Sequence, residues 1–178
     1  MTFPTFASGD VLNATDMNAV GMWLVKSQTV GSAVSSVTVT GAFSSAYDNY
    51  RIIYTGGTAS ASTDIGLKLG ASVTGYYASL QFQLVTAGTV SAAGTNNGAA
   101  WAWIGGAVAG QAVHASFDLL SPFATSYTKV RNGSYQSGDG YGIMNGEHRV
   151  ATSYTDFILT VATGTITGGT IRVYGYRN

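Results

Sequence analysis

Residues 112–119, Ala-Val-His-Ala-Ser-Phe-Asp-Leu, alternate apolar and polar side chains along their length. Successive side chains of a β-strand point to opposite faces of the sheet, so this alternation predicts a strand with one face in a core. The inward row is expected to contain Val113, Phe117 and Leu119. The outward row is expected to contain His114, Ser116 and Asp118.

Further segments show the same strand pattern. In residues 170–176, Ile171 and Val173 are expected to face inward, with Arg172, Tyr174 and Tyr176 on the other face. Residues 156–161 repeat the alternation, with Phe157, Leu159 and Val161 inward. Together with the remaining β-type segments, they make about ten short strands at spacings typical of a sandwich or barrel. The other segments are 34–40, 50–55, 65–69, 79–84, 99–104, 127–131 and 142–151.

The connections between these strands favour an all-β antiparallel fold. Glycine supplies most turns, and only two prolines occur. Helix-period segments of ten or more residues do not separate the strands, which excludes a parallel βαβ architecture. Two stretches rich in glycine and polar residues, 85–98 and 132–141, are predicted to be long loops, where function on a sandwich is often found.

The composition restricts the classes of partner. Charged residues make up 9% of the 178-residue chain, with eight Lys or Arg and eight Asp or Glu, whereas about 25% is usual. Eight cations spread along the sequence do not suggest a nucleic-acid binder. No apolar stretch approaches the roughly 20 residues of a membrane span. Cysteine is absent, so no disulfide or cysteine metal site is expected, and no cofactor or metal is predicted.

The N-terminal segment is predicted to be an attachment device. Residues 6–21 read as a tight turn followed by a short helix that Asn13 caps and Asp16 supports through the helix dipole. Gly21 is expected to end the helix in a left-handed conformation. A helix of about two turns is marginal alone, so it needs a partner to dock on. The residues expected to anchor the chain to that partner are Leu12, Asn13, Asp16, Met17 and Val20.

Residues 6–18, with the pattern Phe-x-Ser-Gly-Asp-Val-Leu-x-Ala-x-Asp-Met-Asn, resemble the leading segment of tailed-bacteriophage virion proteins, especially tail-fibre and minor tail proteins. Residues 47–53 and 169–176 are similar to an early and the last strand of jelly-roll domains in phage structural proteins. The resemblance covers about thirty residues, about a sixth of the chain. It implies an N-terminal anchoring segment, residues 1–30, and a jelly-roll β-sandwich domain, residues 31–178. It also implies a homotrimer.

The titratable residues do not form a recognisable catalytic pattern. Glu147 and His148 are adjacent, so on a strand they point to opposite faces and do not converge on one reacting atom. They are interpreted as part of a polar loop or sheet edge, with an intersubunit salt link as one option. His114 and Asp118 share a strand face but lie about 13 Å apart, too far to hydrogen-bond. No Gly-x-Ser-x-Gly nucleophile motif occurs, so no enzyme is predicted.

The aromatic residues are the remaining candidates for a binding site. Trp101 and Trp103 are expected on one strand face, in the core or in a subunit interface by the favoured interpretation. The alternative is a sugar-stacking platform, with Tyr135 and Tyr141 nearby. Arg51 and Arg172, each in mid-strand, are expected on solvated or half-buried sheet faces.

These observations lead to one main hypothesis with two alternatives. The chain is expected to be a non-enzymatic virion structural protein, a tail-associated fibre or minor tail protein that contacts the host surface. It is expected to bind other virion proteins through its N-terminal segment, without nucleic acid or membrane insertion. A capsid decoration protein is the closest alternative, and a carbohydrate-binding module that recognises a host surface glycan is the alternative from another class.

Overall fold

The alternating segment forms a strand, β8 (Ala112–Leu120), that pairs with three other strands. Val113, Phe117 and Leu119 are completely buried and His114 is exposed, as their alternation predicts. The computed structural model describes residues 7–11, 21–137 and 140–176, and within these ranges every paired strand is antiparallel. The prediction of an all-β antiparallel fold is confirmed.

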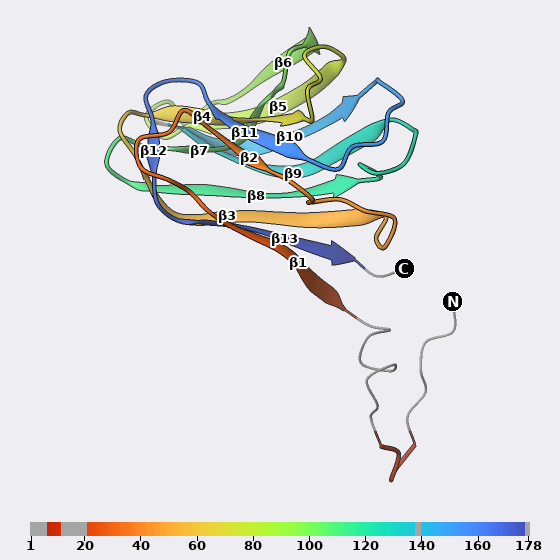
Figure 1. Cartoon of the computed structure of the whole chain (residues 1–178). Helices are drawn as coiled ribbons and strands as arrows, with labels where there is room; N and C mark the ends of the chain where they lie inside the picture. Colours follow the sequence, from red (N-terminus) through yellow and green to blue (C-terminus); the bar gives the residue numbers. More distant parts are fainter. Residues whose placement is uncertain (1–6, 12–20, 138–139, 177–178) are drawn as a thin grey trace.

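The strands form two layers, which Figure 1 shows one above the other. One layer has the order β1-β13-β3-β8, and the other has the order β2-β11-β4-β7. The first consists of β1 (Met22–Thr29), β13 (Thr170–Tyr176), β3 (Asn49–Ala59) and β8. The second consists of β2 (Ser36–Val39), β11 (Phe157–Val161), β4 (Thr63–Leu69) and β7 (Trp101–Ala107).

These eight strands pair from the ends of the chain inward. β1 pairs with β13, β2 with β11, β3 with β8, and β4 with β7. Pairing continues where the chain passes between layers: Val34 bridges Ile166, and Gly110 donates to the Ala59 carbonyl at 2.8 Å. The short strand β12 (Ile166–Thr167) pairs with the end of β3 at the first of these crossings. The fold is therefore one long antiparallel ribbon whose successive strand pairs alternate between the two layers.

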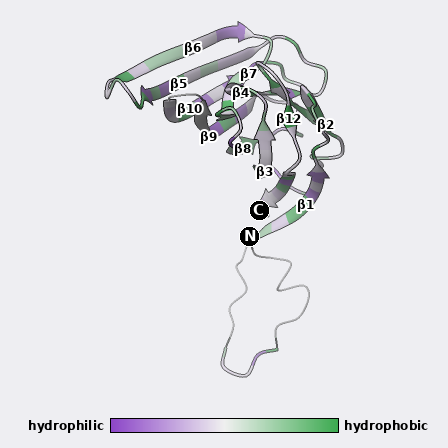
Figure 2. Cartoon of the chain, turned by 90° about the vertical axis from the view of Figure 1, so that its left-hand side faces the viewer, coloured by the Kyte–Doolittle hydropathy of each residue, from purple (hydrophilic) through white to green (hydrophobic). Residues whose placement is uncertain are grey.

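Two hairpins extend the first layer. They are β5 (Tyr76–Leu84) with β6 (Val90–Gly98), and β9 (Thr128–Ser137) with β10 (Gly140–His148). One edge of β8 pairs along its length with β3, and its other edge divides between β7 and β9. From β9 the sheet continues through β10 and β5 to β6. Figure 2 shows β5 and β6 reaching well beyond the two layers.

The core lies between the layers and consists of the inward rows of their strands. Tyr50, Ile52 and Phe117 come from the first layer, and Leu67 and Phe157 come from the second, all completely buried. Each such side chain contributes about 1.5–3 kcal/mol through removal of apolar surface from water. In β13, Ile171 and Val173 are buried while their neighbours are half-buried, as predicted.

Each predicted long loop is mostly strand, although residues 85–89 do form the connection between β5 and β6. Residues 90–98 form β6, and residues 132–141 contain the end of β9 and the start of β10. Alanine, glycine, serine and asparagine have low strand propensity, so these segments carry little local signal. Their strand conformation is stabilised by the hairpin pairings of β5 with β6 and of β9 with β10, and β10 also pairs with β5, which is distant in sequence.

The sheet begins earlier than the expected domain boundary at residue 31. Residues 22–29 form β1, which pairs with β13 from Met22 opposite Tyr176 to Thr29 opposite Thr170. Val30 is buried in the core. Residues 22–30, the second part of the expected anchoring segment, therefore belong to the sandwich: β1 pairs with β13, and Val30 packs in the core.

Candidate functional site

The first layer and its extension present one continuous outer face. Strands β13, β3, β8, β9, β10 and β5 lie side by side, and their registers align the outward side chains in rows across the strands. One row contains Tyr174, Arg51, Asp118 and Arg131. A second row contains Lys129, Glu147 and Tyr77. We call the outward side chains of these six strands, together with Arg149, the outer face.

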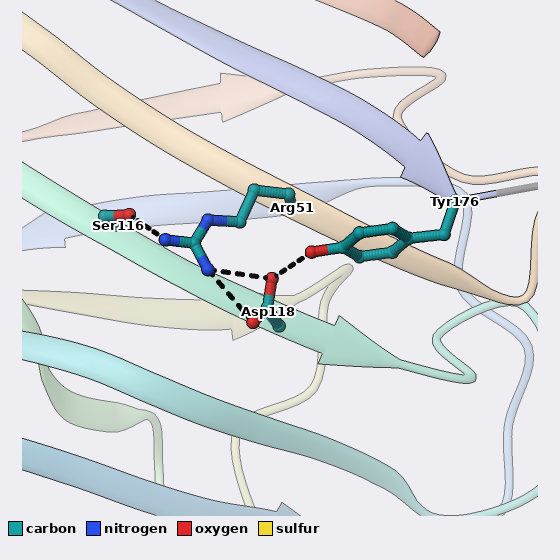
Figure 3. A network of polar contacts seen from close by, with 4 residues as sticks. All are labelled: Arg51, Ser116, Asp118 and Tyr176. Carbon is teal, nitrogen blue, oxygen red and sulfur yellow. Dashed lines mark hydrogen bonds and ion pairs between the residues drawn. The ribbon is translucent and has the colours of Figure 1, made fainter. Parts of the chain in front are cut away.

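Asp118 is the centre of a polar network on the outer face (Figure 3). Arg51 donates through Nη1 to both carboxylate oxygens, at 3.2 and 3.1 Å, and through Nη2 to Ser116 Oγ at 2.8 Å. The Tyr176 hydroxyl donates to Asp118 Oδ1 at 2.6 Å. Burial, followed by this hydrogen bond to Asp118, raises the pKa of Tyr176 to about 12. The expectation of a half-buried Arg51 is confirmed, and its partner lies within the same chain.

A second cluster lies where β10 and β5 meet. Arg149 Nε contacts Glu147 Oε1 at 3.2 Å, and its guanidinium carbon lies 5.1 Å from the centre of the Tyr77 ring. These residues border a shallow depression of about 370 Å³ that also includes Lys129 and Asn145. The Arg149 guanidinium thus lies over an aromatic ring and beside a carboxylate, a geometry typical of cation–π contacts.

His148 lies on the opposite side of β10 from Glu147, as strand alternation predicts. It is completely buried, which corrects the interpretation of this stretch as a polar loop or edge. Its ring lies 4.2 Å from that of Tyr76, and Nε2 is 3.1 Å from the Thr74 carbonyl oxygen and 2.9 Å from Ser72 Oγ. Burial lowers the pKa of His148.

Ser72 and His148 are not arranged for nucleophilic catalysis. A neutral imidazole that donates from Nε2 to the Thr74 carbonyl cannot use the same nitrogen to take the Ser72 proton. The other ring nitrogen, Nδ1, is buried without a hydrogen-bond partner among the described residues, so no carboxylate orients the ring. The pair therefore contributes to packing beneath the sheet.

The predicted aromatic candidates separate in the structure. Trp101 is completely buried, and its Nε1 donates to the Tyr77 carbonyl at 3.2 Å, which confirms the core interpretation for this residue. Trp103 is partly buried against the core. Tyr141 is 52% exposed on β10, whereas the Tyr135 side chain lies outside the described part of the structure. Trp101 is thus unavailable as a sugar-stacking surface, and Tyr141 remains.

Sequence reasoning did not select the basic residues of β9. Lys129 and Arg131 are exposed on either side of the buried Val130, so alternation around this valine was the available signal. Arg149, which follows β10, belongs to the run of titratable residues Glu147-His148-Arg149 that is visible in the sequence. Tyr76 and Tyr77 are adjacent on β5 and point to opposite sides of that strand, with Tyr76 buried.

Most of the predicted N-terminal attachment device lies outside the described residues, including Leu12, Asn13, Asp16, Met17 and Val20. The expected turn is present: Asp10 N donates to the Ala7 carbonyl at 3.1 Å, and Ala7 N donates to the Asp10 carboxylate at 2.6 Å. Gly9 has φ +100°, which the third position of a type II turn requires. Gly21 has φ +97°, the positive value predicted for it.

Comparison with known proteins gives no assignment: no protein family matches the chain, and no curated protein is recognisably similar to it. Among the described residues, no His, Asp and Glu side chains gather in a group of three that could hold a metal ion. The same part of the chain contains no helix with the length and apolar character needed to cross a bilayer.

Proposed function

We propose that this chain is a non-enzymatic structural protein of a bacteriophage virion, built as a jelly roll. The observation that carries the proposal is the strand pairing, in which the first of eight strands pairs with the last, the second with the seventh, and so on inward. A jelly roll is such a ribbon wrapped into two sheets, an architecture common in viral structural proteins. The likeness of residues 6–18 to leading segments of phage tail proteins supports the same conclusion.

The titratable groups of the outer face support a non-enzymatic role. The Asp118 carboxylate accepts from Arg51 and Tyr176, and Glu147 is held by Arg149. A general acid or base must reach a reacting atom and exchange a proton near the working pH. Both carboxylates are instead already held by guanidinium groups of the same chain.

Within the virion, we place the protein on the tail, as a fibre or minor tail protein whose sandwich contacts the host surface. Residues 1–21 precede the first strand and are proposed to attach the chain to another virion protein. A homotrimer is the proposed assembly, because the resemblance to phage structural proteins implies one, and the low number of charges is compatible with association of subunits. A capsid decoration protein is the alternative with the same fold.

Imaging of particles tests this proposal. Antibody raised against residues 22–178 is applied to purified particles of a phage that encodes the chain, and gold label is located by electron microscopy. We expect label at the tail, with a few trimers per particle by quantitative mass spectrometry. Label over the head with hundreds of copies would favour the capsid alternative. Absence of the chain from purified particles would refute a virion role.

A second experiment tests attachment through the N-terminal segment. A chain that lacks residues 1–21 keeps β1 and the whole sandwich, so we expect cooperative unfolding like that of the full chain. It should no longer incorporate into particles when it is produced during infection. Incorporation at the level of the full chain would show that the attachment surface lies on the sandwich instead.

A further inference from the structure

The charges of this chain are distributed unevenly in space, although its formal net charge is zero. The outer face carries five of the eight basic residues and two of the eight acidic ones, a surplus of three positive charges. The acidic residues on the face are Asp118 and Glu147, and the basic residues are Arg51, Lys129, Arg131, Arg149 and Arg172. Folding therefore gathers cations that are spread over more than 120 residues of sequence.

Three of the five cations form no ion pair in the part of the chain that the structure describes, although Arg131 lies opposite Asp118 and Lys129 lies opposite Glu147 in the strand register. Arg51 and Arg149 are matched by Asp118 and Glu147. Within the described ranges, Lys129, Arg131 and Arg172 form no ion pair. Lys129 and Arg131 lie on the same side of β9, about 7 Å apart along the strand. Arg172 lies three strands away on β13, about 14 Å across the sheet.

Neutral polar and aromatic groups surround these cations. The Tyr77 ring lies beside the depression that Lys129 borders. Tyr174 is paired with Arg51 across the strands and follows Arg172 on the same face of β13. Gln81 and Gln83 continue the outward row of β5, opposite Ile143 and the exposed Tyr141 of β10. Amides and phenols hydrogen-bond to hydroxyl groups, and tyrosine rings offer a flat apolar surface.

We propose that the outer face binds an anionic polysaccharide, with Lys129, Arg131 and Arg172 contacting its carboxylates. The surplus of positive charge is complementary to such a polymer, and the surrounding amides and tyrosines suit its sugar rings and hydroxyls. The inference rests on the proposed function, since it names the host surface component that a tail protein with this face would contact.

The density of charge favours a glycan over a nucleic acid. Double-stranded DNA carries one negative charge per about 1.7 Å, and its binding proteins commonly neutralise six or more phosphates. Three cations outside ion pairs, spread over the strands from β13 to β9, are sparse by that standard. A polymer that carries a single carboxylate on a sugar matches them better, because its charges are separated by uncharged hydroxyl groups.

Binding of polygalacturonate to the full chain tests the proposal, with its fully methyl-esterified form as the neutral control polymer. We expect binding to polygalacturonate in 50 mM salt, weakening as salt is raised, and none to the ester. The variant Lys129→Gln/Arg131→Gln/Arg172→Gln should bind about 10- to 100-fold more weakly. Lys68→Gln, which removes one cation from β4 in the other layer, should leave the affinity unchanged.

Folding of each variant is checked by thermal unfolding. If the triple variant does not fold, Lys129→Gln/Arg131→Gln replaces it, because both side chains are exposed. No binding of polygalacturonate, or an affinity that these substitutions leave unchanged, would overturn the inference. Tighter binding to duplex DNA than to polygalacturonate would assign the face to nucleic acid instead. If antibody labels the phage tails but the chain does not bind polygalacturonate, only this inference is refuted. If the chain binds polygalacturonate but is absent from purified particles, only the virion role is refuted.

Discussion

Replacement of Asp118 by asparagine tests the role of the polar network in holding the outer face. The substitution keeps the size of the side chain and one acceptor oxygen but removes the negative charge. Asp118 is 16% exposed and accepts from Arg51 at 3.1 and 3.2 Å and from Tyr176 at 2.6 Å. These contacts join β8 to β3 and β13, so their loss should weaken the contact between central strands of the first layer.

The expected loss of stability comes from two contributions. A hydrogen bond to a charged acceptor contributes about 1 kcal/mol more than one to a neutral acceptor, which applies to the Tyr176 hydroxyl. The ion pair with Arg51 adds about 0–1 kcal/mol, since the arginine side chain is 31% exposed and solvent screens the pair. We therefore expect Asp118→Asn to lower the free energy of unfolding by about 1–2 kcal/mol. For a chain of this length, the melting temperature should fall by about 2–8 °C.

Equilibrium unfolding in urea, followed by tryptophan fluorescence and circular dichroism, measures this change. Asp10→Asn is the matched control, since it makes the same chemical change in an exposed turn and should alter stability by less than about 0.5 kcal/mol. A double-mutant cycle with Arg51→Gln should give a coupling energy of about 0–1 kcal/mol. Equal stability of Asp118→Asn and the unsubstituted chain would refute the structural role of the network.

Three further predictions concern the core, the strands and the N-terminus. Burial lowers the pKa of His148, so its contribution to stability is present above pH about 6.5 and is lost as the pH falls below that value. His148→Phe should therefore reduce the pH dependence of unfolding between pH 5 and 8. An unchanged pH dependence would contradict this prediction. Gly142→Ala should destabilise the protein by about 1–3 kcal/mol or more, since a Cβ would approach the Gln81 carbonyl oxygen to 2.1 Å. Gly94→Ala, where the nearest atom is at 3.4 Å, should cost less than 1 kcal/mol by the same measurement, and equal effects would count against the register of β5 and β10. A chain that lacks residues 1–30 should unfold at lower urea concentration than one that lacks residues 1–21, because only the former loses β1; coincident curves would show that β1 contributes nothing to the sandwich.

Side-chain alternation made several strand faces predictable from sequence. In β8, β11 and β13, inward and outward rows follow from the two-residue period of a strand, and this period is a local property. The separation of Glu147 from His148 follows from the same rule. The rule does not say how deeply each row of side chains is buried, and His148 is completely buried where a polar loop or sheet edge was expected.

The basic outer face could not be predicted from the sequence, because strand order and register create it. Arg51, Asp118 and Arg131 lie in one row only because β3 and β9 pair with opposite edges of β8. The strand β6 likewise forms from residues of low strand propensity, since pairing with β5 satisfies its backbone groups. The sequence by itself determined the all-β class and the orientation of its strongest strands. Which strands pair, and therefore which charges meet, was decided by the packing of the whole chain, because strand pairing joins residues that are distant in sequence.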